Sequence, residues 1–166
     1  MKTILFFHGF NSSNTTNKFK VIDSEHKVSW SVNYSSLTHK EVALLYNKFI
    51  QQVQPDILVG HSLGGYWALL KSIEHKIPCV AINPTLHPHK TFDDYVDLKT
   101  LDFNDGVHRA YHLELQDEII DQRAIQEWVE NETSNYKIFS YTDGHHRCQY
   151  LDEINWAIND LTKRIG

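Results

Sequence analysis

The chain has 166 residues, of which 41% are hydrophobic and 22% charged, and its net charge is −5. A chain of this length and composition buries a core of its own, so intrinsic disorder is excluded and we expect residues 1–166 to form a single domain. The acidic balance and the scattered basic residues argue against nucleic acid or an anionic membrane as a partner. No apolar run approaches the roughly 20 residues that cross a bilayer, so membrane insertion is not expected.

Taken in chain order, short apolar runs alternate with longer runs of helical period, which is typical of β-α units and a mainly parallel sheet. We predict about six strands, at residues 3–7, 27–32, 56–60, 78–82, 109–115 and 137–141. We predict helices at residues 39–53, 63–75, 122–130 and 150–164. The sequence therefore predicts an α/β fold whose mostly parallel strands are flanked by helices.

Two connections do not fit this alternation. Residues 11–26 are polar, and we expect them to contain only a short helix. Residues 84–107 carry two prolines and a glycine, with a helical turn predicted at 92–98. A connection as long as the second is uncommon unless it is functional.

The two cysteines and the N-terminus bear on the compartment. The apolar run at 3–7 is too short for the core of a signal peptide and is better used as a strand. Cys79 falls in an apolar run and Cys148 in a predicted loop, which does not suggest a disulfide scaffold. We expect two free thiols and a cytoplasmic location.

The most informative segment is Gly60-His61-Ser62-Leu63-Gly64-Gly65, which lies between the predicted strand 56–60 and the predicted helix 63–75. A Gly-x-Ser-x-Gly pattern in this context is typical of a nucleophile elbow, in which a sharp turn exposes the serine hydroxyl. The helix N-terminus beside it favours developing negative charge. Ser62 is therefore the candidate nucleophile. The alternative is a glycine-rich turn whose serine only caps the helix.

A serine nucleophile needs a base, an acid that orients the base, and donors for the oxyanion. His145 and His146 follow the last predicted strand, and we assign the base to His146 with His145 as the alternative. Asp117 lies just after the strand 109–115 and is the candidate acid. Asp121 is the alternative acid, although it also suits the N-cap of the next helix.

The oxyanion donors are expected from two backbone amides. His8-Gly9-Phe10 follows the first strand, and the glycine lets the Phe10 amide approach a substrate oxygen. The Leu63 amide, directly after the nucleophile, is the second donor. His8 is then interpreted as a support for this loop rather than as a second base.

A metal cluster is the alternative interpretation of the histidines. His87 and His89 are the residues that would join the His145-His146 pair. No recognised metal-site spacing connects them, so neither a metal nor another cofactor is predicted.

Five blocks of the sequence resemble those of YqiA-like esterases, which are small α/β-hydrolases without a large lid domain. The blocks are 8–13, 60–68, 82–84, 117–124 and 144–147, in that order along the chain. The resemblance implies an α/β-hydrolase fold and a serine esterase with Ser62 as nucleophile, Asp117 as acid and His146 as base. Two departures bear on substrate preference: Gln116 stands where the family usually has glycine, and Cys148 where it usually has an aromatic residue.

We therefore expect a cofactor-independent esterase whose partner is a small-molecule ester with a short or medium acyl chain. A thioesterase or small-amide hydrolase with the same triad is the alternative within enzymes, and a non-catalytic binding protein is the alternative outside them. The apolar residues of 84–107 are interpreted either as a wall for the acyl group or as a cover over the sheet edge; they are Leu86, Phe92, Tyr95 and Leu98. The sequence does not indicate an oligomeric state.

Overall fold

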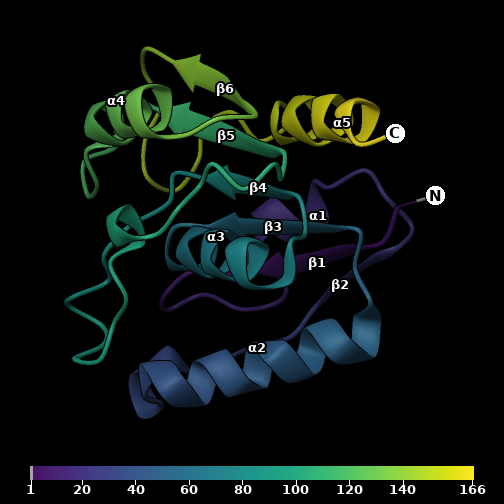
Figure 1. The fold of residues 1–166 in the computed structure, drawn as a ribbon, viewed down its shortest axis with the longest axis vertical. Helices are drawn as coiled ribbons and strands as arrows, with labels where there is room; N and C mark the ends of the chain where they lie inside the picture. The colour runs from purple at the N-terminus through teal and green to yellow at the C-terminus, as the bar shows by residue number, and fades with distance from the viewer. Residues whose placement is uncertain (1) are drawn as a thin grey trace.

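The structure, a computed structural model, describes residues 2–166 and contains one six-stranded sheet of order β2-β1-β3-β4-β5-β6 (Figure 1). Every pair of neighbouring strands is parallel. The strands are β1 Ile4–Phe7, β2 Lys27–Ser29, β3 Ile57–His61, β4 Cys79–Ile82, β5 Arg109–Glu114 and β6 Tyr136–Tyr141. The predicted parallel α/β architecture is confirmed.

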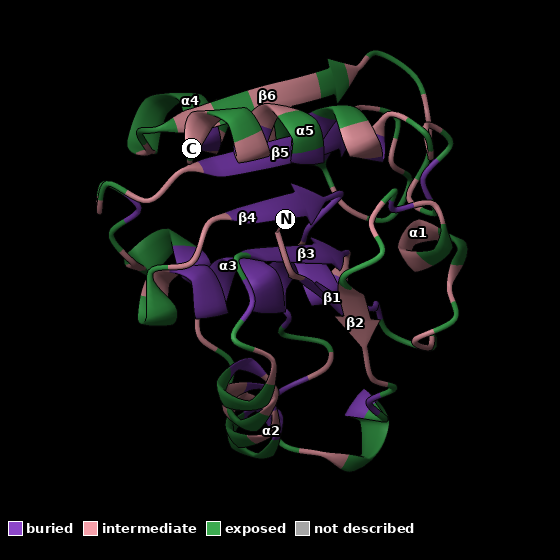
Figure 2. Ribbon diagram, turned by 90° about the vertical axis from the view of Figure 1, so that its right-hand side faces the viewer, coloured by how far each residue is buried: buried purple, intermediate pink, exposed green. Residues whose placement is uncertain are grey.

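The helices cover both faces of the sheet. They are α1 Asn17–Lys20, α2 His39–Val53, α3 Leu63–His75, α4 Gln122–Glu132 and α5 Ile154–Arg164. Alternate residues of β1 explain the two layers, because successive side chains of a strand point to opposite faces. Leu5 and Phe7 belong to the core cluster that contains residues of α2, α3 and α4, while Ile4 and Phe6 belong to the cluster that contains residues of α5. The strands between the layers are buried, as Figure 2 shows for β3, β4 and β5.

Local signals in the sequence determine where the helices begin and end. At the start of α2, the Thr38 hydroxyl accepts from the Glu41 amide and the Glu41 side chain accepts from the Thr38 amide, which forms a capping box. The residues that follow α2 and α3, Gln54 and Lys76, adopt left-handed backbone conformations that end these helices. α4 begins after Asp121, whose carboxylate accepts from the amides of residues 123 and 124.

Two predicted elements are longer than the observed ones. The strand predicted at 27–32 ends at Ser29, and the Val32 amide donates instead to His8 Nε2 at 2.8 Å. The helix predicted at 150–164 begins at Ile154. The amides of Gln149 and Tyr150 donate to the Glu114 carboxylate at 2.6 and 3.3 Å, which keeps this part of the chain in a loop.

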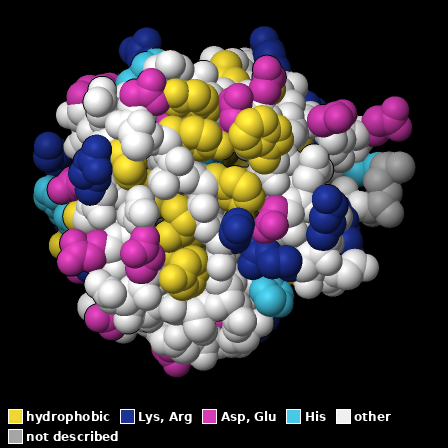
Figure 3. All heavy atoms as spheres, turned by 90° about the horizontal axis from the view of Figure 1, so that it is seen from above, with side chains coloured by type: hydrophobic (Ala, Val, Ile, Leu, Met, Phe, Trp, Pro, Cys, Tyr) yellow, Lys and Arg dark blue, Asp and Glu magenta, His cyan; other side chains and the backbone are white. Residues whose placement is uncertain are grey.

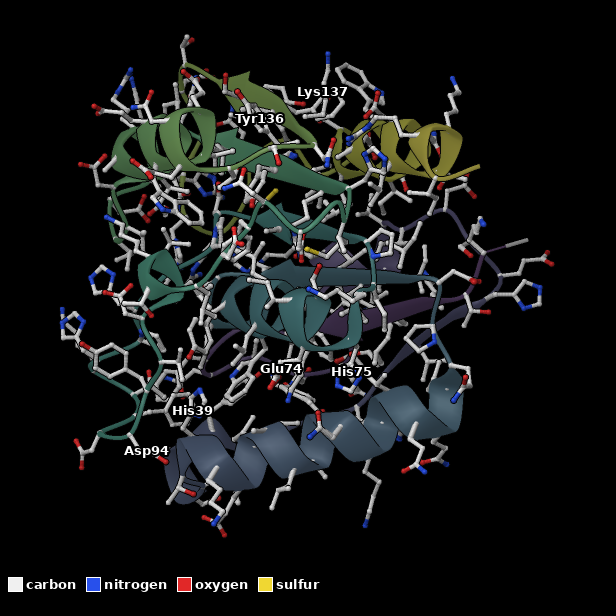
Figure 4. All side chains as sticks on the ribbon, viewed as in Figure 1. His39, Glu74, His75, Asp94, Tyr136 and Lys137 are labelled. Carbon is white, nitrogen blue, oxygen red and sulfur yellow. The ribbon has the colours of Figure 1, made fainter. Side chains whose placement is uncertain are left out.

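The long connection 84–107 packs against the protein instead of standing free of it. Of the four apolar residues interpreted as an acyl wall or as a cover over the sheet edge, Leu86, Phe92 and Leu98 are at most 2% exposed and belong to the core cluster, while Tyr95 is 36% exposed. Burial in the core argues against the acyl wall for the first three. The prediction of a helical turn at 92–98 is wrong. Among the described residues of this connection, the only helical segment is the 3₁₀ turn η2, Leu98–Thr100. Asp94 ties the connection to α2 by accepting from the His39 and Lys40 amides, and Figure 4 shows His39 and Asp94 at the same end of that helix.

The edge strand β6 is the least buried long strand of the sheet, with residues that are intermediate or exposed. Apolar side chains gather on the surface seen from this side of the molecule (Figure 3). Trp156 of α5 is 57% exposed.

Across residues 2–166, we find no helix with both the length and the apolar character needed to span a membrane.

Candidate active site

Ser62 occupies a sharp turn between β3 and α3. Its φ of 58° and ψ of −117° lie in a backbone region that residues with side chains rarely adopt. The turn is possible because Gly60 and Gly64 lack side chains: a Cβ on Gly60 would lie 2.0 Å from the Gly64 carbonyl oxygen. A Cβ on Gly64 would lie 1.9 Å from the Phe7 carbonyl oxygen. The close packing of β3, α3 and β1 therefore requires both glycines and leaves Ser62 at the carboxyl end of the sheet.

Three side chains from separate parts of the chain form a line of hydrogen bonds. Ser62 Oγ lies 2.7 Å from His146 Nε2, and His146 Nδ1 lies 2.7 Å from Asp117 Oδ2. An ionised carboxylate only accepts hydrogen bonds, so Nδ1 carries the proton and the Nε2 of a neutral His146 ring accepts from the serine hydroxyl. The three residues that the sequence singles out as nucleophile, base and acid are therefore in contact.

Asp117 lies in the turn after β5, and its side chain is fully buried. Burial by itself would raise the pKa of the carboxyl, but hydrogen bonds from His146 and from the amides of Ile120 and Ile119 lower that pKa below its ordinary value. The alternative acid, Asp121, instead uses Oδ1 to cap the N-terminus of α4. Asp117 is thus an ionised, oriented partner for the His146 ring.

The loop that carries His146 is held by its backbone. The His61 Nε2–H donates to the His146 carbonyl oxygen at 2.6 Å. Burial, with a smaller contribution from the positive charge of Lys18, lowers the pKa of His61 to about 3, so this ring is neutral at pH 7. Asn83 adds bonds from Nδ2 to the carbonyl oxygens of His145 and His146 at 3.2 and 3.4 Å. The His145 side chain is exposed, whereas His146 points its ring at Ser62.

Glu114, at the end of β5, joins these contacts and was not identified from the sequence as a site residue. Its side chain is fully buried, and it accepts from Gln149 N and Tyr150 N through Oε1 and from Asn83 Nδ2 through Oε2. In turn, Asn83 Oδ1 accepts from the Glu114 amide at 2.8 Å. The available signal in the sequence is an acidic residue within the predicted strand 109–115, since an acidic residue is seldom buried unless it is paired.

The predicted oxyanion loop is held by His8. Its Nε2 accepts from the Val32 amide at 2.8 Å, so Nδ1 carries the proton and donates to the Gly9 carbonyl oxygen at 2.8 Å. The Gly9-Phe10 peptide is trans, so the Phe10 N–H points away from the oxygen that His8 binds. Leu63 is the first residue of α3, where an amide has no partner within the helix.

One group of side chains is close enough together to hold a metal ion. It consists of His112, Glu114 and Cys148, which are all buried and whose ligand atoms lie within 4.8 Å of one another. The carboxylate oxygens already accept the hydrogen bonds described above, and His112 Nε2 lies 3.2 Å from Glu114 Oε2. Within residues 2–166, the rings of His87 and His89 stack on each other and are not part of this group. Cys79 and Cys148 are free thiols, as predicted.

Comparison with known proteins identifies the family. The model of UPF0227, an uncharacterised protein family, matches residues 3–153. The chain belongs to this family. A UPF0227 protein of Shewanella sp. (strain ANA-3) is 28% identical over 147 residues, which cover 75% of this chain and 80% of that protein. One from Shewanella loihica is 31% identical over 105 residues, and this match spans only 57% of each protein. The resemblance to YqiA-like proteins is confirmed.

Solved structures show the same architecture. An α/β hydrolase enzyme from a lagoon-sediment metagenome aligns with a TM-score of 0.80 at 13% identity, covering 99% of this chain and 91% of that one. A putative hydrolase of the α/β superfamily from Xanthomonas campestris aligns with a TM-score of 0.78 at 14% identity and 99% coverage of both chains. Est1E from Butyrivibrio proteoclasticus, solved with ferulic acid, aligns with a TM-score of 0.75 at 14% identity, covering 99% and 89%. The UPF0227 chain therefore has the α/β-hydrolase fold.

Proposed function

We propose that this UPF0227 protein is a serine hydrolase that cleaves short- to medium-chain acyl esters. The observation that carries the proposal is the continuous line of hydrogen bonds from Ser62 through His146 to Asp117, with both distances at 2.7 Å. A serine hydroxyl is a weak nucleophile unless a base accepts its proton, and a histidine oriented by a carboxylate is such a base. The elbow at the carboxyl end of the parallel sheet supports the same reaction.

In the proposed reaction, His146 Nε2 takes the Ser62 proton while the serine oxygen attacks the ester carbonyl carbon. Asp117 holds the His146 ring and balances its positive charge. The amides of Phe10 and Leu63 donate to the oxyanion of the tetrahedral intermediate, where one such donor typically contributes about 3–4 kcal/mol. His146 then gives its proton to the leaving alcohol, and a water molecule activated by His146 hydrolyses the acyl-enzyme. No step uses a cofactor.

The direct test is labelling with a fluorophosphonate, read by intact mass and run beside Ser62→Ala. We expect one adduct per chain in the unchanged protein and none in the variant, because the reagent captures an activated serine. Ser62→Ala is also expected to lower kcat on acyl esters by at least about 10⁴-fold. Absence of an adduct on the folded unchanged protein would contradict the proposal and favour a binding protein.

Paired variants test the roles of the other two residues. His146→Ala should lose far more activity than His145→Ala, because only the first removes the ring bonded to Ser62. Asp117→Asn should lower kcat by about 10³–10⁴-fold, since the wrong histidine tautomer then forms, while Asp121→Asn should affect mainly stability. Equal losses within either pair would mean that the assignment is wrong. A panel of esters, acyl thioesters and anilides with a common acyl group then identifies the bond that is cleaved.

A further inference from the structure

A cavity of about 320 Å³ lies at the predicted oxyanion loop, because Phe10 is one of its lining residues. It is lined by residues 10–13, which follow β1, and residues 31–35, which follow β2. Both segments leave the carboxyl ends of their strands, where ligands of parallel α/β sheets bind. Its volume falls in the range of about 300–1,000 Å³ that is typical of small-molecule sites.

The lining of this cavity is polar but carries no charge. Six of its nine lining residues are serines or asparagines: Asn11, Ser12, Ser13, Ser31, Asn33 and Ser35. Asn33 accepts from the Ser35 hydroxyl at 2.7 Å through Oδ1, so its NH₂ group remains as a donor. The other three lining residues are Phe10, Val32 and Tyr34, and the Tyr34 hydroxyl is already bonded to the His8 carbonyl oxygen and to Tyr46.

The cavity and Ser62 share one segment of chain, which relates them to a single substrate. β1 lies next to β3 in the sheet, and a Cβ on Gly9 would lie 3.5 Å from the Ser62 Cβ. Phe10, whose amide is the proposed oxyanion donor, lines the cavity with a side chain that is 45% exposed. This shared segment is what would let one substrate place a group in the cavity while its carbonyl group meets the proposed oxyanion donors.

We propose that this cavity binds a neutral, polyhydroxylated part of the substrate, so that the enzyme prefers O-acyl esters of sugars. This inference rests on the esterase function proposed above. Hydroxyl and amide side chains both donate to and accept from sugar hydroxyls, and an exposed aromatic ring offers a flat surface to the C–H face of a sugar ring. Ser13, Ser31 and Ser35 already bond to neighbouring side chains, but a hydrocarbon chain in the same place would cover the Asn11 and Ser12 side chains and the Asn33 NH₂ group without satisfying them. The uncharged lining provides no ion-pair partner for a phosphate or carboxylate.

The test compares two acetyl esters that differ only in the leaving group, 6-O-acetylglucose and hexyl acetate, with the thioester S-acetylpantetheine. We expect kcat/KM to be at least about tenfold higher for 6-O-acetylglucose than for hexyl acetate, because sites built for hydroxyl groups reject groups that lack them. In the double variant Ser12→Ala/Asn33→Leu, kcat/KM for the sugar ester should fall about tenfold further than kcat/KM for hexyl acetate. The matched control is Ser134→Ala/Asn131→Leu, two exposed positions far along the chain on and after α4, which should change neither value.

The possible outcomes separate this inference from the function on which it rests. Equal or higher kcat/KM for hexyl acetate, with the fluorophosphonate adduct still formed, overturns the sugar site and leaves the esterase proposal intact. Preference for S-acetylpantetheine overturns it in favour of the thioesterase alternative. Loss of the preference in the control variant overturns the assignment to this cavity. If no ester is cleaved and no adduct forms, both proposals fail.

Discussion

Replacement of Glu114 by glutamine tests whether one buried carboxylate holds the loop that carries His146. The carboxylate accepts hydrogen bonds from Gln149 N and Tyr150 N through Oε1, and from Asn83 Nδ2 through Oε2. A glutamine oxygen keeps one of these sets of bonds, but its NH₂ group then faces a donor in the other. The substitution therefore leaves buried groups unpaired while it changes the volume of the side chain very little.

The size of the effect follows from the pKa of this group. Burial by itself would raise the pKa of Glu114, but hydrogen bonds from His112, Cys148 and the Gln149 amide outweigh burial and lower it to about 2, from an ordinary value of 4.5. Because one pKa unit corresponds to about 1.4 kcal/mol, the ionised form contributes about 3 kcal/mol to the free energy of unfolding. A lowered folded-state pKa means that this contribution is fully present above pH 4.5 and is lost as pH falls towards 2.

The measurement is urea unfolding of the unchanged protein and Glu114→Gln at several pH values. At pH 7 we expect the variant to be less stable by about 3 kcal/mol, and we expect the difference to shrink between pH 5 and pH 3. Glu127→Gln, at an exposed position of α4, is the control and should change stability by less than about 0.5 kcal/mol. A difference below 1 kcal/mol at pH 7, or one that does not change with pH, would refute this reasoning.

Two further predictions concern stability. Gly64→Ala should lower the free energy of unfolding by about 3 kcal/mol or more, because the new Cβ would lie 1.9 Å from the Phe7 carbonyl oxygen. Thermal unfolding measures this change, and a loss of stability below about 1 kcal/mol would contradict the prediction. Asp105→Asn should lower the free energy of unfolding by about 3–5 kcal/mol, since Asp105 is the bidentate partner of Arg109, whose side chain is 2% exposed. Lys76→Met removes the exposed partner of the same carboxylate and should lower the free energy of unfolding by less than about 1 kcal/mol. Similar losses for Lys76→Met and Asp105→Asn in urea unfolding would contradict this prediction.

The sheet could be predicted from the sequence because each strand carries its own signal. The central strands are short apolar runs bounded by glycine, proline or polar residues, and their parallel arrangement follows from the helices between them. Such signals are local and do not depend on the rest of the fold. Errors occur where a distant group decides the structure. The start of α5 is one case, because Glu114, more than thirty residues earlier, accepts the amides of Gln149 and Tyr150.

The candidate triad was also accessible from the sequence, for a different reason. Ser62 lies in a recognisable pattern, while Asp117 and His146 are located by their position after the strands that the fold requires. Glu114 and Asn83 carry no such pattern, since their function in the loop follows only from contacts among β4, β5 and the chain around His146. The apolar residues of 84–107 left two interpretations open because hydrophobicity alone does not distinguish a pocket wall from a residue packed in the core. Leu86, Phe92 and Leu98 are in the core.

The arrangement separates the proposed chemistry from the proposed recognition of substrate. The proposed nucleophile, acid and base follow β3, β5 and β6, and the buried groups Glu114 and His61 hold the loop that carries His146. The polar cavity follows β1 and β2, at the opposite edge of the sheet from β6, in segments that contain no member of the triad. Only the Gly9-Phe10 segment belongs to both. Changes in residues 11–13 and 31–35 can therefore alter the leaving group that is accepted without moving Ser62, His146 or Asp117, which is how a hydrolase of this fold acquires a new substrate.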